Sequence, residues 1–172
     1  MRRIRYSVAV SLDGYIAGPK GEYDWIIMDP EIDFQDLFSQ FDTMLVGRKS
    51  YEAMTKQGGG GGGWGMKVLV FSKQLKQKAH PDVTIVSKDI KKQLTALKKT
   101  RGKDIWLFGG GLLFRSLLKL GLVDTVEVAV IPVLVGGGIP LLPPPAGRAK
   151  LKLTGHRVYK KSGIVLLEYA VR

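Results

Sequence analysis

Three short turns in the sequence carry the residue types that bind phosphate groups. Each follows an apolar, strand-like segment, and the carboxyl ends of parallel strands meet at one edge of a sheet, where ligands bind. The three turns are Val46-Gly47-Arg48-Lys49-Ser50, Phe71-Ser72-Lys73 and Phe108-Gly109-Gly110-Gly111-Leu112. Cations, hydroxyl groups and glycine-flanked backbone N–H groups all stabilise anions. The sequence therefore predicts one crevice that holds several phosphate groups.

The first two turns combine cations with a hydroxyl group. Arg48, Lys49 and Ser50 open a predicted helix, where they could bind a phosphate such as the one on the ribose of NADPH. Ser72 and Lys73 repeat this chemistry after the next strand. The alternative is structural, with Ser50 as a helix cap and the basic side chains in solvent. Two such turns beside a glycine turn favour phosphate binding.

The third turn places Gly109, Gly110 and Gly111 between a strand and a helix. Backbone N–H groups there can approach a pyrophosphate, and the helix N-terminus adds about half a positive charge. Tight packing of the strand against the helix explains the glycines equally well. The turn is not a Walker A loop, and it does not complete G-x-G-x-x-G, because Phe114 stands where the third glycine belongs.

Candidate substrate contacts lie near the N-terminus. Asp13 could position a substrate or a water molecule, and Tyr23 and Trp25 could stack on a flat ring. A turn-capping carboxylate in Leu-Asp-Gly is the alternative for Asp13, and core packing is the alternative for the two aromatic residues.

The composition excludes several other kinds of site. The chain has no cysteine and only two histidines, His80 and His156, so we expect neither disulfides nor a metal site. The apolar run after the N-terminus breaks at Asp13, too early for a signal peptide. The apolar stretch from Leu122 to Leu142 contains charges, prolines and glycines that prevent it from spanning a bilayer. We therefore expect a cytoplasmic protein with no membrane partner.

The net charge of +12 raises the question of a nucleic-acid partner. Eleven Lys or Arg lie between Lys67 and Lys103, whereas eight of the fifteen acidic residues lie between Asp13 and Asp42. Surfaces that bind single-stranded nucleic acid interleave aromatic residues with cations, and Lys73 to Lys103 contains none. A basic surface beside an acidic pocket rim instead suits a phosphate-bearing cofactor and a polar heterocycle. For most of the lysines, a solvated surface is the simpler interpretation.

The elements that position these residues follow from hydrophobic periodicity and turn signals. At 172 residues the chain is expected to form a single domain. Strands are predicted at 2–10, 43–46, 67–71, 83–86, 105–108, 123–130, 150–159 and 164–171, and helices at 33–41, 48–55, 89–99 and 112–120. Asp89 is the predicted N-cap of the third helix, and Gly58 to Gly63 are expected to form a flexible loop. This order predicts an α/β fold with a mainly parallel sheet flanked by helices and a C-terminal antiparallel hairpin.

Five segments, in this order over nearly the whole chain, resemble the dihydrofolate-reductase-like superfamily. They are Ser11-Leu12-Asp13-Gly14-Tyr15-Ile16-Ala17-Gly18, Val46-Gly47-Arg48-Lys49-Ser50-Tyr51-Glu52, Phe108-Gly109-Gly110-Gly111, Gly121-Leu122-Val123-Asp124 and Pro132-Val133-Leu134-Val135-Gly136-Gly137-Gly138-Ile139-Pro140-Leu141. The chain is similar to the RibD C-terminal branch, which contains the reductase domain of the bifunctional riboflavin-biosynthesis enzyme. The resemblance implies an NADPH-dependent reductase that transfers hydride to a pteridine- or pyrimidine-like heterocycle, such as dihydrofolate or a ribosylaminouracil phosphate.

The resemblance also implies a contact for each part of NADPH. The implied contacts are Ala9, Ile16 and Ala17 for the nicotinamide carboxamide, Gly47, Arg48, Lys49 and Ser50 for a phosphate, Ser72 and Lys73 for the adenosine phosphate, and Gly109, Gly110, Gly111, Leu112 and Leu113 for the pyrophosphate.

In true dihydrofolate reductases a carboxylate on the first helix holds the pteridine. Asp29, Glu31, Asp33 and Asp36 lie near that helix here, and Asp33 or Asp36 is our candidate for this catalytic position. Surface carboxylates at a helix start are the alternative. The resemblance further implies a homodimer formed through the last strands. Two other functions stay open: a nucleotide-binding domain without turnover and, ranked below it, a basic nucleic-acid-binding protein.

Overall fold

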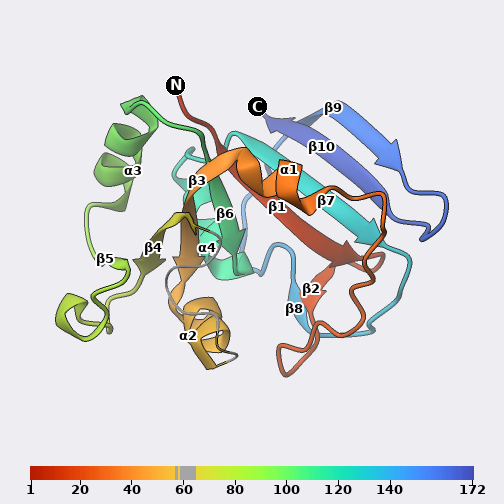
Figure 1. Cartoon of the computed structure of the whole chain (residues 1–172), viewed down its shortest axis with the longest axis horizontal. Helices are drawn as coiled ribbons and strands as arrows, with labels where there is room; N and C mark the ends of the chain where they lie inside the picture. Colours follow the sequence, from red (N-terminus) through yellow and green to blue (C-terminus); the bar gives the residue numbers. More distant parts are fainter. Residues whose placement is uncertain (57, 59–64) are drawn as a thin grey trace.

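The computed structural model describes residues 1–56, 58 and 65–172, and its centre is an eight-stranded sheet (Figure 1). The strands of this sheet are β1 (Ile4–Ser11), β3 (Phe41–Gly47), β4 (Lys67–Phe71), β5 (Thr84–Val86), β6 (Asp104–Gly109), β7 (Thr125–Ile131), β9 (Leu151–Val158) and β10 (Val165–Val171). Their order across the sheet is β5-β4-β3-β6-β1-β7-β10-β9. The strands from β5 to β7 are parallel, and β10 pairs antiparallel with both β7 and β9. The predicted mainly parallel sheet with an antiparallel C-terminal hairpin is confirmed.

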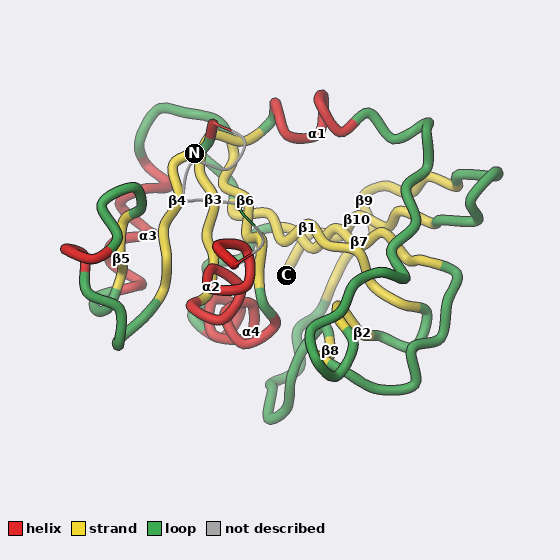
Figure 2. Tube along the Cα trace, turned by 60° about the horizontal axis from the view of Figure 1, so that its bottom comes forward, coloured by secondary structure: helices red, strands yellow, loops and turns green. Residues whose placement is uncertain are grey.

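Helices cover both faces of the sheet. They are α1 (Phe34–Ser39), α2 (Arg48–Lys56), α3 (Ile90–Lys99) and α4 (Gly111–Lys119), with a short 3-10 helix, η2, at Gln77–Ala79. On one face, Leu107 of β6 packs in a core with Leu94 of α3 and Leu117 of α4. On the other face, Trp106 packs in a core with Tyr51 of α2, and the side chains of α1 join this core. Figure 2 shows α1 on one side of the sheet, set apart from the other helices.

The sheet opens between two of its central strands. β1 and β6 pair only as far as Tyr6 and Leu107, although β1 continues to Ser11 and β6 to Gly109. On its other side β1 stays paired with β7 along its whole length from Arg5 onward. The divergence lies at the carboxyl ends of parallel strands, which is where such sheets bind ligands.

Two short strands lie in segments where the sequence analysis predicted no strand. β2 (Tyr15–Ala17) and β8 (Ile139–Pro140) form a small antiparallel pair beside the carboxyl end of β1. Each is only two or three residues long and is flanked by glycine, so its sequence has no readable alternation.

The prediction for Asp89 was only partly correct. Asp89 is the N-cap of α3, but it has a φ of 52°, in the left-handed region, and its side chain makes no capping hydrogen bond. The predicted glycine loop from Gly58 to Gly63 lies outside the described residues, apart from Gly58.

Candidate functional site

The three predicted phosphate-binding turns lie side by side. β3 pairs in parallel with β4 on one side and with β6 on the other, so all three strands end at the same edge. In Figure 1 the arrowheads of β3 and β6 point towards α2 and α4. A Cβ atom added to Gly110 would lie 3.3 Å from the Oγ of Ser50, so the first and third turns are in contact. The predicted common edge is confirmed.

A cavity of about 1170 Å³ extends from this edge across the sheet face that α1 covers. The cofactor candidates on its wall are Ala9, Ile16, Ala17, Lys49, Ser50, Gly109 and Gly110. The substrate candidates Tyr23, Asp33 and Asp36 line the same cavity. The fold thus places candidate residues for the cofactor and candidate residues for the substrate around one cavity.

The other candidates of the first two turns, Gly47, Arg48, Ser72 and Lys73, are not among the residues that line this cavity. Arg48 pairs with Glu52 one turn along α2, with an Nη1–Oε1 distance of 2.9 Å. The Oγ of Ser72 accepts hydrogen bonds from the backbone N–H groups of Gln74 and Leu75, at 3.1 and 3.0 Å. The Ser72 hydroxyl thus caps its own turn. Lys73 is exposed and belongs to a second, open groove.

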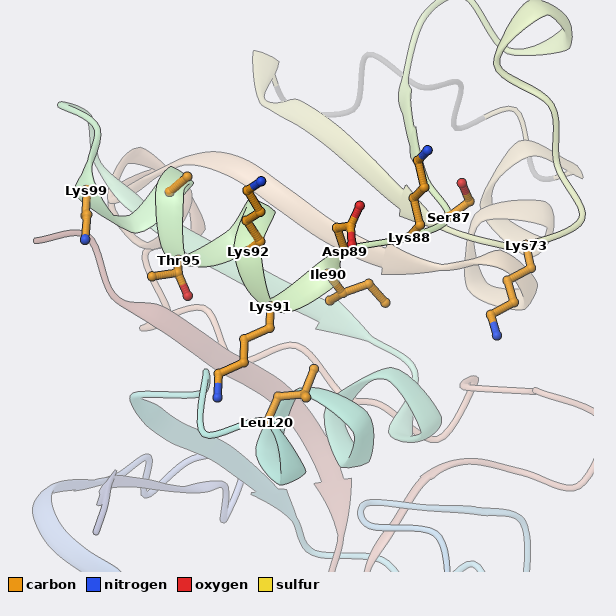
Figure 3. A pocket seen from close by; sticks show the side chains of 11 residues that line it. Lys73, Ser87, Lys88, Asp89, Ile90, Lys91, Lys92, Thr95, Lys99 and Leu120 are labelled. Atoms are coloured by element: carbon orange, nitrogen blue, oxygen red, sulfur yellow. The ribbon is translucent and has the colours of Figure 1, made fainter.

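That second groove runs along α3 and is rich in lysine (Figure 3). The volume of the groove is about 1010 Å³, and the cationic residues that line it are Lys73, Lys88, Lys91, Lys92 and Lys99. None of the residues that line it is aromatic. The groove therefore offers cations to an anion but no ring on which nucleic-acid bases could stack.

The start of α4 presents backbone to the cavity. Gly110 is the N-cap of α4, and Gly111 is its first residue. A Cβ atom on Gly111 would lie 2.7 Å from the carbonyl oxygen of Pro140 and 2.7 Å from Cδ of Pro143, so only glycine fits. Leu112 is 53% exposed, whereas Leu113 is buried in the core. Gly109 and Gly110 therefore present backbone to the cavity just before the N-terminus of α4, whereas Gly111 is packed against Pro140 and Pro143.

Asp13 makes three hydrogen bonds within its own neighbourhood. Its carboxylate accepts from the Ser11 hydroxyl at 2.6 Å and from the backbone N–H groups of Val135 and Gly136 at 3.1 and 2.7 Å. These bonds, led by that from Ser11, lower the pKa of Asp13 below its ordinary value. Asp13 is not among the residues lining the cavity, so the geometry favours a structural role that joins β1 to the segment after β7. Its catalytic role stays a prediction.

Asp33 and Asp36 both line the cavity and both contribute to α1. The Asp33 carboxylate accepts a hydrogen bond from the backbone N–H of Asp36 at 2.8 Å, which makes it the N-cap. Asp36 accepts from Nε2 of Gln40 at 3.3 Å. Both side chains are exposed, so they can meet solvent or a ligand. Helix capping and substrate contact are compatible here, and the substrate contact stays a prediction.

The two aromatic candidates separate in the structure. Tyr23 is 52% exposed and lines the cavity. Trp25 packs instead with a small core around Ile131 and Tyr159, and its Nε1 donates to the carbonyl oxygen of Glu22 at 3.3 Å. The position of Trp25 therefore favours the packing interpretation.

Sequence reasoning missed the charged floor of the cavity. Arg5 on β1 and Glu127 on β7 form a bidentate pair, with Nε–Oε1 and Nη2–Oε2 distances of 2.7 and 2.8 Å. Nη1 of Arg5 also donates to Oε1 of Gln40 at 2.7 Å. Burial alone would lower the pKa of Arg5, but the bond and charge of Glu127 raise it above its ordinary value.

The side chains of Phe38, Trp106 and Phe108 lie beside this floor and form an aromatic wall of the cavity. The ring centroids of Trp106 and Phe38 are 5.1 Å apart, and those of Trp106 and Phe108 are 5.2 Å apart in a T-shaped arrangement. Nε1 of Trp106 donates to the carbonyl oxygen of Ser7 at 3.0 Å, across the gap between β6 and β1. All three rings line the cavity.

One sequence signal could have revealed this face. Arg5 and Ser7 alternate with apolar residues in a strand otherwise suited to a buried position, and Glu127 does the same in β7. A polar residue at every second position of a central strand indicates that one face meets a cavity and not a core.

Metal-ligand clusters and membrane-spanning helices are both absent from the part of the chain that the structure describes. No group of three or more His, Asp or Glu there could hold a metal ion. None of its helices combines the length and apolar character that crossing a bilayer requires.

The fold and the site together define a class of protein, the dihydrofolate-reductase-like α/β proteins with a ligand cavity where the central sheet opens. Dihydrofolate reductase from Enterococcus faecalis, solved with NADP(H) and RAB-propyl, has this fold, with a TM-score of 0.70 at 15% identity over 99% of this chain and 96% of that one. RibD from Acinetobacter baumannii has it with a TM-score of 0.76 at 18% identity, over 100% of this chain and 58% of the other.

The chain belongs to the RibD C-terminal domain family, which matches residues 2–59 and 62–165. It is 35% identical to the uncharacterised protein YyaP of Bacillus subtilis (strain 168), over 98% of this chain and 94% of YyaP. A putative riboflavin biosynthesis protein from Shewanella sp. PV-4 superposes with a TM-score of 0.79 at 26% identity, covering 100% of this chain and 99% of that protein. The chain is therefore a member of a reductase-like family.

Proposed function

We propose that this protein is an NADPH-dependent reductase that transfers hydride to a small pteridine- or pyrimidine-like heterocycle. One observation carries the proposal: a single cavity joins the edge where the glycine and basic turns lie to an aromatic and carboxylate-lined space under α1. A dinucleotide at the edge and a flat substrate under α1 would meet where the sheet opens between β1 and β6.

The residues present fit NADPH. Gly109 and Gly110 would hold the pyrophosphate, because both line the cavity directly before α4 and neither carries a side chain of its own. Lys49 and Ser50, with Arg48 beside them, would bind the phosphate of the ribose, and Ser72 and Lys73 lie at the next strand end. Ala9, Ile16 and Ala17 would flank the nicotinamide. When bound, NADPH supplies the hydride.

The chain itself supplies orientation and exclusion of water. Trp106, Phe108 and Phe38 form an apolar wall that would hold a flat ring against the sheet. Placing the acceptor carbon next to the donor in a water-poor space accounts for a large share of the rate in such reactions. Asp33 and Asp36, at the mouth of the cavity, are the proposed carboxylates for holding a polar edge of the substrate.

The family relationships support this chemistry. The Enterococcus protein is a dihydrofolate reductase in complex with NADP(H), and a Corynebacterium diphtheriae protein with the same fold is described as pyrimidine reductase-like, with a TM-score of 0.71 at 17% identity. A nucleic-acid partner is disfavoured by the absence of aromatic residues among those lining the groove along α3. A nucleotide-binding domain without turnover is the remaining alternative.

Titration with NADPH and with NADH tests the cofactor assignment, with tryptophan fluorescence as the signal because Trp106 lines the cavity. We expect NADPH to bind more tightly than NADH. Arg48→Ala should weaken NADPH binding about tenfold or more and leave NADH binding nearly unchanged, because it removes a charge-assisted phosphate contact. Turnover with a panel of reducible heterocycles then separates an enzyme from a binding domain.

Arg101→Ala is the matched control, since Arg101 is exposed at the amino end of β6, away from the phosphate turns. It should bind both dinucleotides like the wild type. Equal and weak responses of the wild type to NADPH and NADH would overturn the cofactor assignment.

A further inference from the structure

The strand register arranges the cavity face in rows. Ala9 of β1, Ala129 of β7 and Leu166 of β10 are register partners and form one row of small or apolar side chains. The next row on the same face, two residues along each strand, contains Ser7 and Glu127, and Glu168 of β10 continues it. Two residues of strand span about 6.8 Å, close to the width of a substituted six-membered ring.

Glu127 is already saturated with donors. Its carboxylate accepts from Nε and Nη2 of Arg5, and Oε1 also accepts from the Thr125 hydroxyl at 2.9 Å. Glu127 is 6% exposed, so a ligand reaches little of it. This carboxylate serves to hold Arg5 and to place a fixed negative charge in the floor.

Glu168 stands directly opposite Glu127 and is free to bind a ligand. The two are register partners on antiparallel strands, both line the cavity, and Glu168 is partly exposed. No described residue donates a hydrogen bond to its side chain. Gly155 makes room for it, because a Cβ atom there would lie 2.8 Å from Oε2 of Glu168. The carboxylates of Glu127 and Glu168 thus stand face to face, with Arg5 bound to Glu127 and with Arg157 of β9 lining the same cavity.

We propose that Glu168 is a substrate-positioning residue that accepts hydrogen bonds from the N–H edge of an amino-substituted, flat heterocycle. The ring would lie over Ala9 and Ala129, between the sheet and the aromatic wall, with its donor edge turned towards Glu168. This inference rests on the proposed function and narrows the substrate class to flat heterocycles that carry amino donors on the edge facing Glu168.

Calorimetric titration of the whole protein with 2,4-diaminopyrimidine tests the inference. Uracil is the comparison ligand, because it has carbonyl acceptors at the two ring positions where 2,4-diaminopyrimidine has amino donors. Wild-type protein should bind 2,4-diaminopyrimidine more tightly than uracil. Glu168→Gln, which keeps the shape and removes the charge, should weaken 2,4-diaminopyrimidine binding about tenfold and change uracil binding little. Glu168→Asp, which keeps the charge, should retain part of the preference for 2,4-diaminopyrimidine over uracil.

Glu52→Gln is the control, because this glutamate lies on α2 and does not line the cavity. The Glu52→Gln protein should bind both ligands like the wild type.

NADPH titration of the same Glu168→Gln protein separates the inference about Glu168 from the proposed function. If NADPH binds and depends on Arg48 but Glu168→Gln has no effect on 2,4-diaminopyrimidine, the inference fails while the proposed function stands. If Glu168 selects 2,4-diaminopyrimidine but NADPH does not bind, the proposed function fails. A wild type that prefers uracil, or that binds neither ligand, overturns the inference without any variant.

Discussion

Arg5 and Glu127 place opposite charges on the cavity floor, each less than a tenth exposed. Removing two charges from water costs several kcal/mol per ion, which their attraction recovers only with good geometry and further hydrogen bonds. Both conditions hold, because the pair is bidentate and Gln40 and Thr125 satisfy the remaining positions. The pair therefore keeps the floor polar next to a ligand space without leaving an unsatisfied group.

Glu127→Ala should destabilise the protein strongly. The substitution leaves the Arg5 guanidinium buried without its main partner, and breaking a buried pair in this way costs about 3–5 kcal/mol. Asp104 lies 3.6 Å from Arg5 and retains part of the attraction, so we expect the lower end of this range. Urea denaturation followed by circular dichroism measures the change in the free energy of unfolding.

Glu52→Ala provides the contrast, because it breaks an i,i+4 pair with Arg48 on the surface of α2. Such pairs contribute about 0.3–0.5 kcal/mol. Equal losses of unfolding free energy in Glu127→Ala and Glu52→Ala would show that the Arg5–Glu127 pair is no more important to stability than a surface pair.

Sequence reasoning predicted residues of the strand-end turns that line the cavity, but not the cavity floor, for a physical reason. Lys49, Ser50 and Gly109 sit in local motifs, where a strand ends and a helix begins within a few residues. Arg5 and Glu127 are 122 positions apart, and only the register of β1 with β7 brings them together. No local pattern records that register.

At the scale of elements, the start of α4 is fixed by contact with β8. Pro140 of β8 and Pro143 press against Gly111, and β8 in turn pairs with β2 after β1. The glycine turn therefore links the strand-end edge to the segment that carries Ile16 and Ala17. Of the two interpretations of the glycines from sequence, packing is confirmed at Gly111. Gly109 and Gly110 line the cavity, and phosphate binding there stays a prediction.

Gly111→Ala should lower stability by about 1–3 kcal/mol, the usual cost of forcing an extra methyl group into a packed site. The new Cβ would overlap the backbone oxygen of Pro140, which cannot move without displacing β8. Thermal unfolding measures the loss. Gly147→Ala is the matched control, because a Cβ there meets open space, and it should change stability by no more than about 0.5 kcal/mol. A neutral Gly111→Ala would show that β8 is not held against α4.

The elements themselves differed in how far the sequence predicted them. β4 was predicted with its observed bounds because it is a continuous apolar run between polar residues. The helices were found within a few residues because their apolar spacing is regular. β2 and β8 were missed because strands of two or three residues form only through tertiary pairing, which a sequence pattern does not contain.

At the scale of the whole molecule, charge is divided between two regions. The lysine-rich groove along α3 adjoins the end of β4, while Asp33 and Asp36 lie at the mouth of the cavity. A net charge of +12 concentrates anions near the surface, so a dinucleotide phosphate meets a favourable field before it binds. The homodimer implied by the resemblance and the cytoplasmic location expected from the sequence stay predictions.

Salt should therefore weaken the binding of NADPH more steeply than that of NADH. The two dinucleotides differ by one phosphate, which the proposal places near Arg48, Lys49 and Lys73. Raising the ionic strength from about 0.01 to about 1 M shortens the screening length from about 30 to about 3 Å, so the preference for NADPH should narrow. Fluorescence titrations along this series measure both affinities.

Lys73→Glu should reduce the salt dependence of NADPH binding, whereas Lys152→Glu, on β9 at the far edge of the sheet, should alter it less. Parallel salt slopes for NADPH and NADH in the wild type would contradict the assignment of the extra phosphate to this edge, because a contact between charges must weaken as they are screened.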